Sequence, residues 1–365
     1  METKGQWCDS AFCPDVGKID AYNIKIHSYA ERRFYCTPCR RTFGADKGTF
    51  FEALRTPRLI LLDAVAMMVE RNSLRAISRI KHCKVDAELY WVGLAGQQGA
   101  AVNRHFIRNL HLTQVQIDDL WSFVKKKQEH LQPKDPANWG DAWIWRAIAL
   151  PNHLRVVTHL SHERSEEEAK AFLAAFKSRT DGRPPLFTRG KLPAYTAALI
   201  ATYSTSELPP TKRGRGRPRK TPRRVLDPDL LYAQVDKRCK KGRVVEVRRR
   251  IIFGSTEILT EVLGEQQINT SYVERDNLTS RQSNGRLVRK TLSHSKKSYF
   301  LWQHLELEDA FFNFVRSHQA LRIALPQPTL GRKWQRRTPA MAAGLTDHIW
   351  TLEELLSYRV PPSED

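Results

Sequence analysis

The stretch Gln116–Val124, QIDDLWSFV, places two adjacent carboxylates, Asp118 and Asp119, inside a run of alternating and aromatic residues. Such alternation predicts a half-buried β-strand. A second stretch, Tyr272–Thr279 (YVERDNLT), puts Glu274 at the start of a basic helical pattern. Unpaired carboxylates are costly to bury. Acids from distant segments of a chain with net charge +21 therefore suggest a site for hard divalent cations that faces a polyanion.

These acids also have a purely structural interpretation. Asp118 or Asp119 would then be a turn residue at the end of a strand. Glu274 would be an acid at a helix N-terminus, where the helix dipole favours negative charge. The local sequence leaves both interpretations open.

The composition limits the classes of partner. The 365 residues suggest two or three domains, and a hydrophobic content of 41% is enough for a substantial core. Lys and Arg number 60 against 39 Asp and Glu, which favours a nucleic-acid partner over an anionic membrane. The sequence has no apolar run long enough to span a bilayer and begins without an apolar signal segment, so we expect an intracellular protein with no membrane partner.

Four of the six cysteines form two knuckles near the N-terminus. Cys8 and Cys13 make a Cys-x4-Cys motif, and Cys36 and Cys39 make a Cys-x2-Cys motif 22 residues later. Two thiolate knuckles suit a closed tetrahedral Zn²⁺ site, whose metal would supply folding energy to a small segment. The alternative is a set of unrelated reduced thiols. We expect a zinc ribbon over residues 1–48 with one structural Zn²⁺ ion.

A helical pattern follows from Pro57 to about Gln98. It predicts an apolar first helix, a second helix capped by Ser73, and a third over residues 86–93; a separate linking helix is expected at 103–110. Three helices with a short turn between the last two resemble a helix-turn-helix, with Arg75 and Arg79 as DNA contacts. The alternative is a plain helical bundle. This domain is assigned to residues 49–110.

The central segment predicts an α/β core. Strands are expected at 143–150 and 154–160 after the acidic strand, then a helix at 165–178, a strand at 186–188 and a helix at 193–202. This order describes an RNase H-like mixed sheet flanked by helices, assigned to residues 111–310. It places the carboxylate of the first strand near the end of the fourth.

Several segments resemble the transposases of the insertion sequence one family. They are QIDDLWSFV, LPAY at 192–195, VERDNL at 273–278, RKTLS at 289–293 and TPAMAAGL at 338–345. The cysteine knuckles and the expected helix-turn-helix also fit, so the resemblance covers nearly the whole chain. It implies an RNase H-fold DDE recombinase that binds terminal inverted repeats and uses two Mg²⁺ (or Mn²⁺) ions to cleave and join DNA.

The resemblance also implies residue roles. Asp118 matches the first catalytic acid and Glu274 the last, both as Mg²⁺ ligands, with Asp119 in a supporting role. Arg281 lies on the helical face of Glu274 and would hold a DNA phosphate. The implied partner is double-stranded DNA, as element ends and target, bound by a homo-oligomer in the nucleoid of a prokaryotic cytoplasm.

The middle catalytic acid of that family is missing. The pattern places an Asp two residues before the Leu-Pro-x-Tyr turn, and this chain has Gly190 there, between Arg189 and Lys191. Asp181 is close in sequence, but it lies in a turn-like stretch before the strand and is interpreted as structural. We therefore expect either a DDE transposase with impaired cleavage or, as the alternative, an inactive relative that acts as a DNA-binding protein or repressor.

A basic insertion is expected over residues 204–268. Its segment RGRP at 215–218 resembles an AT-hook, in which Arg enters a narrow A·T minor groove. The alternative is a basic linker that contacts only phosphates. The stretch at 244–253 is strand-like and basic and is expected beside bound DNA, while residues 311–365 are expected to be helical. The expected DNA-binding residues of the insertion are Arg213, Arg215, Arg217, Arg219 and Lys220.

Overall fold

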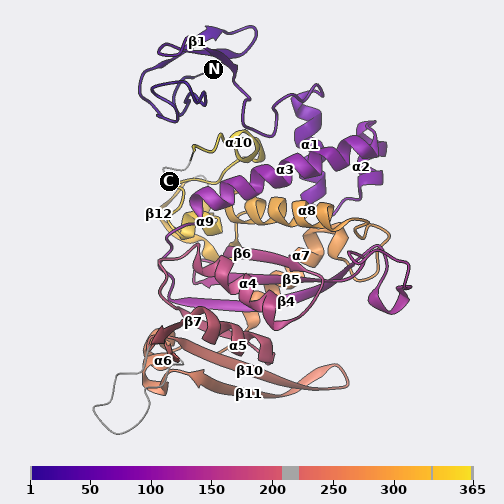
Figure 1. The fold of residues 1–365 in the computed structure, drawn as a ribbon, viewed down its shortest axis with the longest axis vertical. Helices are drawn as coiled ribbons and strands as arrows, with labels where there is room; N and C mark the ends of the chain where they lie inside the picture. The colour runs from indigo at the N-terminus through magenta and orange to yellow at the C-terminus, as the bar shows by residue number, and fades with distance from the viewer. Residues whose placement is uncertain (1, 208–221, 330–331, 363–365) are drawn as a thin grey trace.

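The computed structural model describes residues 2–207, 222–329 and 332–362. Figure 1 shows a small sheet at one end of the molecule, the helices α3 and α8 next to it, and a larger sheet toward the other end. None of the described helices combines the length and the apolar character that a membrane span requires.

The small N-terminal sheet carries the cysteine knuckles. It consists of β1 (Ile24–Ser28), β2 (Arg33–Cys36) and β3 (Thr42–Gly44), all antiparallel. Phe34 and Phe43 pack together on the cysteines and form a core of very few residues.

The next segment folds into three helices, α1 (Arg58–Val69), α2 (Leu74–Lys81) and α3 (Val85–Phe106). The hydroxyl of Ser73 accepts a hydrogen bond from the Ala76 amide and caps α2 as expected.

Helix α3 is continuous over 22 residues, so the separate third and linking helices of the sequence analysis are wrong. Its glycines allow it to lie against α8 (Ser298–Ala310) at very short range. A β-carbon at Gly96 would lie 2.3 Å from the Gln303 carbonyl oxygen, and one at Gly99 would lie 2.9 Å from that of Glu306. This close packing stabilises a glycine-rich helix that local propensity alone would interrupt.

The larger sheet has six strands in the order β11-β10-β7-β4-β5-β6. The pairs β4–β5, β5–β6 and β10–β11 are antiparallel, while β7 runs parallel to both β4 and β10. The chain is therefore a mixed α/β protein with helices flanking a mixed sheet, as expected. The strands are β4 (Gln114–Val124), β5 (Gly140–Leu150), β6 (Leu154–Ser161), β7 (Leu186–Gly190), β10 (Leu231–Lys240) and β11 (Arg243–Phe253).

Helices cover both faces of this sheet. On one face, α4 (Glu166–Lys177) and α5 (Pro193–Thr202) bury a core that includes Trp145, Phe187 and Tyr195. On the other face lie α7 (Ser271–Ser283) and α8, and Leu120 and Ile144 pack there against residues of α8. Successive residues of a strand point to opposite faces. Asp118 therefore points toward α7, and Asp119 toward α5.

Two strands of the sheet come from the region that the sequence analysis assigned to the basic insertion. Strand β10 joins the sheet because Leu231 and Ala233 are buried against Leu259 of α6 (Thr256–Leu263). A separate pair, β8 (Ser204–Glu207) and β9 (Arg223–Leu226), precedes it. The AT-hook-like residues Arg213, Arg215, Arg217, Arg219 and Lys220 lie outside the described residues.

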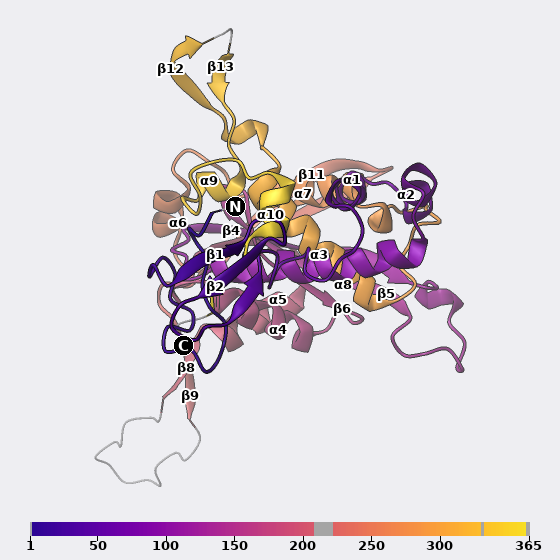
Figure 2. The same ribbon diagram turned by 90° about the horizontal axis from the view of Figure 1, so that it is seen from above.

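The C-terminal region contains a β-hairpin as well as the helical structure that was expected. Strands β12 (Ile323–Thr329) and β13 (Arg332–Gln335) form a hairpin that projects from the molecule in Figure 2. Pro326 and Pro328 fall in β12, and proline disfavours a helix interior because it lacks an N–H donor. Around the hairpin lie a π-helical turn at Phe311–Val315 and the short helices α9 (Pro339–Ala342) and α10 (Leu352–Ser357).

Candidate functional site

Asp118, Asp119 and Glu274 line one cavity of about 410 Å³ beside β4 and α7. The strand supplies the two aspartates, and the first turn of α7 supplies the glutamate. Three arginine side chains also line the cavity. Its other lining residues are Leu120, Trp121, Trp143, Arg164, Asn277, Leu278, Arg281 and Arg289.

Gln116 fastens the N-terminus of α7 to β4. Its side-chain oxygen accepts hydrogen bonds from the Tyr272 and Val273 amides, each at 3.0 Å, and its nitrogen donates to the Asn269 carbonyl at 2.9 Å. The first amides of a helix have no partner within the helix, so this amide side chain satisfies two of them. The contact fixes the helix turn that carries Glu274 beside the strand that carries Asp118.

Asn277 makes a second link between the two elements. Its side-chain nitrogen donates to Asp118 Oδ2 at 2.8 Å. Sequence analysis missed Gln116 and Asn277 as site residues. Their spacing from the acids could have indicated them. Gln116 is two residues before Asp118 and so on the same face of the strand, and Asn277 is three residues after Glu274 and so on the same side of the helix.

Asp118 holds its charge at an energetic cost. Its side chain is 28% exposed, and its pKa is raised from the ordinary 3.8 to about 6. Burial is the main cause, and the negative charges of Asp119 and Glu274 raise the pKa further, while Arg189 opposes them. A cation bound near this carboxylate would therefore stabilise its charged form.

Two arginines form ion pairs with Asp119 and neutralise its charge. Its side chain is 1% exposed, and the carboxylate pairs with the Arg189 guanidinium and with Arg164 Nε, the latter at 2.7 Å. Arg189 is itself buried and lies 3.7 Å over the ring of Tyr195 on α5. Both carboxylate oxygens of Asp119 are thus engaged in ion pairs. In this structure Asp119 therefore holds Arg164 and Arg189 beside β4.

Glu274 is about half exposed and pairs with Lys237 of β10. Its Oε1 also accepts a hydrogen bond from the Thr270 hydroxyl at 2.6 Å. A strand from the region assigned to the insertion therefore provides a cation at the carboxylate cavity, which sequence spacing did not indicate.

Gly190 ends β7 on the same face of the sheet as Asp118. The β4–β7 pairing ends at Gln116 and Thr188. Because side chains alternate along a strand, Asp118 and Gly190, each two residues further on, lie on the same face as that pair. A β-carbon at Gly190 would meet no atom nearer than the Val235 carbonyl oxygen at 3.9 Å. The backbone therefore leaves space for a larger side chain at the position where the family resemblance expects the middle acid.

Arg281 and Asp181 have structural contacts. Arg281 donates to the carbonyl oxygens of Leu287 and Trp121, at 2.8 and 3.0 Å, so much of its guanidinium is committed to holding the cavity wall. Asp181 pairs with His111 at 2.8 Å, before the start of β7 and away from the cavity.

A buried charge cluster holds the middle of α7. Arg155 of β6 contacts Asp276 through Nε and Nη2, at 2.9 and 2.8 Å, and Arg146 of β5 contacts Asp276 at 2.9 Å. Both arginines also contact Asp309 of α8. The cluster, which also includes Glu308, ties α7 and α8 to the sheet and was not anticipated from the sequence.

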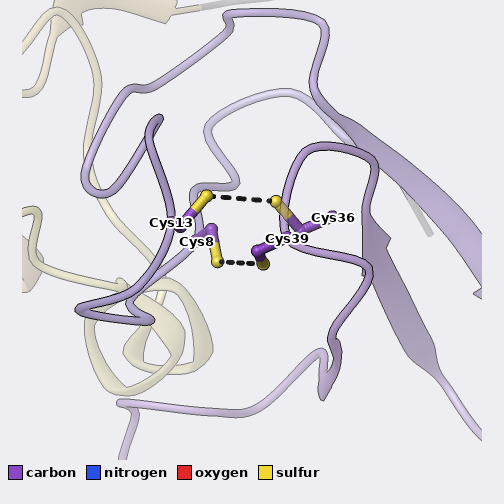
Figure 3. Close-up of side chains that lie close together, drawn as sticks. All are labelled: Cys8, Cys13, Cys36 and Cys39. Atoms are coloured by element: carbon purple, nitrogen blue, oxygen red, sulfur yellow. Dashed lines mark hydrogen bonds between the residues drawn. The ribbon is translucent and has the colours of Figure 1, made fainter.

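The four cysteines form a compact ligand set, shown in Figure 3. The sulfur atoms of Cys8 and Cys39 are 3.6 Å apart, as are those of Cys13 and Cys36, and all four lie within 4.8 Å of one another. Tetrahedral thiolates about 2.3 Å from Zn²⁺ lie about 3.8 Å apart. The donor set therefore fits a structural metal ion such as Zn²⁺.

The carboxylate cavity does not offer such a set. Within residues 2–207, 222–329 and 332–362, the cysteines are the one group of three or more His, Cys, Asp or Glu side chains gathered closely enough to share an ion. Asp118 and Asp119 point to opposite faces, Asp119 is paired twice, and Gly190 offers no ligand. The residues present do not fit a pair of divalent ions.

The predicted DNA contacts of the helical segment are accessible. Arg75 and Arg79 are both exposed on α2, four residues apart and so on one side of the helix, while Ile77 is buried. This placement allows both cations to face a ligand.

Comparisons with known proteins do not show a family for this chain. The chain matches no protein-family model and no curated protein. Among solved structures, the crystal structure of a pre-cleavage Mos1 transpososome is similar over 68% of this chain and 75% of that chain, at 11% sequence identity and a TM-score of 0.17. A similarity this weak does not show a shared fold or function. The residues of the site are therefore the basis for inferring the function.

Proposed function

We propose that the chain is a DNA transposase of the DDE type whose active site has lost its middle acid. The observation that carries the proposal is that Asp118 and Glu274, 156 positions apart, line the same cavity beside β4. The negative charge of Glu274 contributes to the raised pKa of Asp118, which supports an electrostatic coupling between the two acids.

The sheet supports an RNase H-like core. Strands β4, β5 and β6 form an antiparallel series, and β7 and β10 then extend the other side of β4 in parallel. The first acid lies on the first strand of this series, and Gly190 ends the fourth. In open α/β sheets, functional sites form beyond the carboxyl ends of parallel strands.

The charge of the chain supports DNA as the partner. A net charge of +21 and the exposed Arg75 and Arg79 of α2 supply the electrostatic attraction that binding to phosphates requires. The cations of residues 213–220 add to it. Element ends and target DNA, bound by a homo-oligomer, are the substrates that this proposal requires.

A second function is a DNA-binding protein without cleavage activity. It is favoured by the ion pairs of Asp119 with Arg189 and of Glu274 with Lys237, which neutralise two acids with protein side chains. Together with the missing ligand at Gly190, they describe a site whose charges are balanced without metal.

Binding to duplex DNA tests both functions at once. For the purified full chain, the logarithm of affinity should fall linearly with the logarithm of salt concentration as phosphate counterions are displaced. A chain that binds no duplex DNA at low salt would overturn both functions. A DNA cleavage assay then distinguishes the transposase from the DNA-binding protein without cleavage activity.

A further inference from the structure

Residues 236–250 form a two-stranded ribbon, which we call the basic ribbon. Arg249 and Arg250 at its base pair with Val235 and Gln234 inside the sheet, and the rest of the ribbon continues past the end of β7. Strand β7 stops at Gly190, opposite Val235, while β10 continues to Lys240. Lys241 and Gly242, both at positive φ, make a two-residue turn into β11. Five residues beyond Val235 project about 17 Å at ~3.4 Å per residue. Figure 1 shows the turn standing clear of other elements.

The basic ribbon concentrates positive charge. It contains eight Lys and Arg residues and two acids, which gives a net charge of +6. Glu246 pairs with Arg248 at 2.6 Å and lies 4.0 Å from Arg238. In the part of the chain that the structure describes, Lys240, Lys241, Arg243 and Arg250 form no ion pair. All eight cations are exposed: Lys237, Arg238, Lys240, Lys241, Arg243, Arg248, Arg249 and Arg250.

Both faces of the basic ribbon carry cations. Lys237 and its partner Val247 lie on the face toward α7, where Lys237 reaches Glu274. Arg250 lies on the opposite face, because its partner Gln234 contacts Thr196 of α5. Near the tip, Val244 and Val245 are 53% and 57% exposed, so apolar groups stand among the charges. Such a ribbon has little core to bury and much surface suited to a polyanion.

We propose that the basic ribbon is a DNA-binding arm that lies in the major groove of a duplex held across the carboxylate cavity. The major groove of B-DNA is about 12 Å wide and admits a two-stranded β-ribbon. Cations on both faces of a ribbon in that groove reach the phosphates of both strands. The valines can contact thymine methyl groups, which are exposed there.

The contact between Lys237 and Glu274 fixes where the duplex runs. It places the base of the arm at the edge of the carboxylate cavity, so a duplex in contact with the arm passes that cavity. This inference rests on the proposed function, because it takes DNA as the partner. Duplex RNA would not serve, since its major groove is too deep and narrow for side chains to read.

The first test uses a native thiol and no substitution. Cys239 is exposed on the arm, paired with Val244 near the tip. A saturating B-form duplex should slow its alkylation by N-ethylmaleimide several-fold, and a duplex RNA of the same length should slow it much less. If Cys239 is alkylated at an unchanged rate in a chain that is bound to DNA, the proposal that the basic ribbon binds DNA is wrong.

The second test removes two cations at the tip. Lys240→Ala with Arg243→Ala should lower the salt slope of DNA binding by about 2, because each phosphate that is no longer neutralised reduces the slope by about 0.9. The matched control is Arg108→Ala with Arg183→Ala, because both arginines are exposed before the starts of β4 and β7, away from the cavity. The control should keep the native slope.

The outcomes separate the arm from the proposed function. Equal slopes for the tip variant and the control, in a chain that binds DNA, overturn the arm and leave the transposase proposal standing. No binding of DNA by the unmodified chain overturns both. A tip variant with the native unfolding temperature and a reduced slope supports the arm without reference to cleavage.

Discussion

Arg189 and Asp119 form a buried ion pair that joins the end of β7 to β4, one residue before Gly190. The Arg189 side chain is 2% exposed and that of Asp119 is 1% exposed, so each charge depends on the other. Breaking a buried pair leaves an uncompensated charge. The site thus has a fixed protein cation next to the position where the family resemblance expects a metal-binding acid.

Asp118→Asn should stabilise the protein at neutral pH. The pKa of Asp118 is raised to about 6, so the folded state binds a proton more tightly than the unfolded state does. Stability is therefore lost as pH rises from about 4 to 6, and the charged group costs the fold about 1–3 kcal/mol at pH 7. Urea unfolding at pH 7.5 should show this gain, and the gain should shrink at low pH.

Asp181→Asn is the matched control for that prediction. The pKa of Asp181 is lowered, mainly by its hydrogen bond with His111, so its charge favours the folded state. This variant should not gain stability at neutral pH. If Asp118→Asn instead destabilises the protein at pH 7.5, the assigned electrostatics of the cavity are wrong.

Asp276→Ala should destabilise the fold by about 3–5 kcal/mol, because it leaves charges of Arg146 and Arg155 buried with fewer partners. The surface pair of Lys170 and Glu166 on α4 is the control, and Glu166→Ala should cost less than about 1 kcal/mol. Chemical denaturation measures both. Equal losses for the two variants would contradict the role of the buried cluster in holding α7.

Purified protein should contain one Zn²⁺ ion per chain, bound by Cys8, Cys13, Cys36 and Cys39. Elemental analysis checks the stoichiometry. Cys36→Ser should lose the metal and unfold the N-terminal sheet, because that segment has almost no other core. Cys239→Ser is the control, since this thiol is exposed on β10 and lies outside the cluster. Protein without zinc would refute the site.

Arg215→Ala with Arg217→Ala should remove a preference for A·T-rich duplexes. The RGRP stretch resembles an AT-hook, whose arginines enter narrow minor grooves. Competition binding with A·T-rich and G·C-rich duplexes measures the preference. An equal loss of affinity for both duplexes would identify the segment as a basic linker that contacts phosphates only.

Much of the central fold could be predicted because its elements carry strong local patterns. The alternation in β4 and the helical pattern at 165–178 locate a strand and a helix near their observed positions. Spacing places Gln116 on the strand face of Asp118, but its hydrogen bonds to α7 could not be predicted, because contacts between segments 156 residues apart leave no local periodicity.

Where the sequence analysis was wrong, tertiary packing had overridden local propensity. A third helix was expected at 86–93 and a linking helix at 103–110, but α3 continues through Gly96 and Gly99, where it lies against α8. The run at 231–240, which falls in the expected insertion, forms a strand of the main sheet in which Leu231 and Ala233 are buried. The roles of Asp118, Glu274 and Gly190 in catalysis stay predictions.

A cleavage and strand-transfer assay in Mg²⁺ tests whether Gly190 disables a DDE active site in this chain. The substrate is duplex DNA from the sequences that flank the coding region. Three chains are compared: the unmodified chain, Gly190→Asp, and Gly190→Asp with Glu274→Ala. Because a β-carbon at Gly190 would meet no atom nearer than 3.9 Å, the backbone of β7 accepts the substitution without a clash at that atom.

We expect weak or no cleavage by the unmodified chain, clear cleavage by Gly190→Asp, and loss of that cleavage when Glu274→Ala is added. Robust cleavage by the unmodified chain would contradict the claim that Gly190 disables the site. No cleavage by Gly190→Asp, in a protein that still binds DNA, would contradict the claim that the missing acid is the cause and would favour the DNA-binding function.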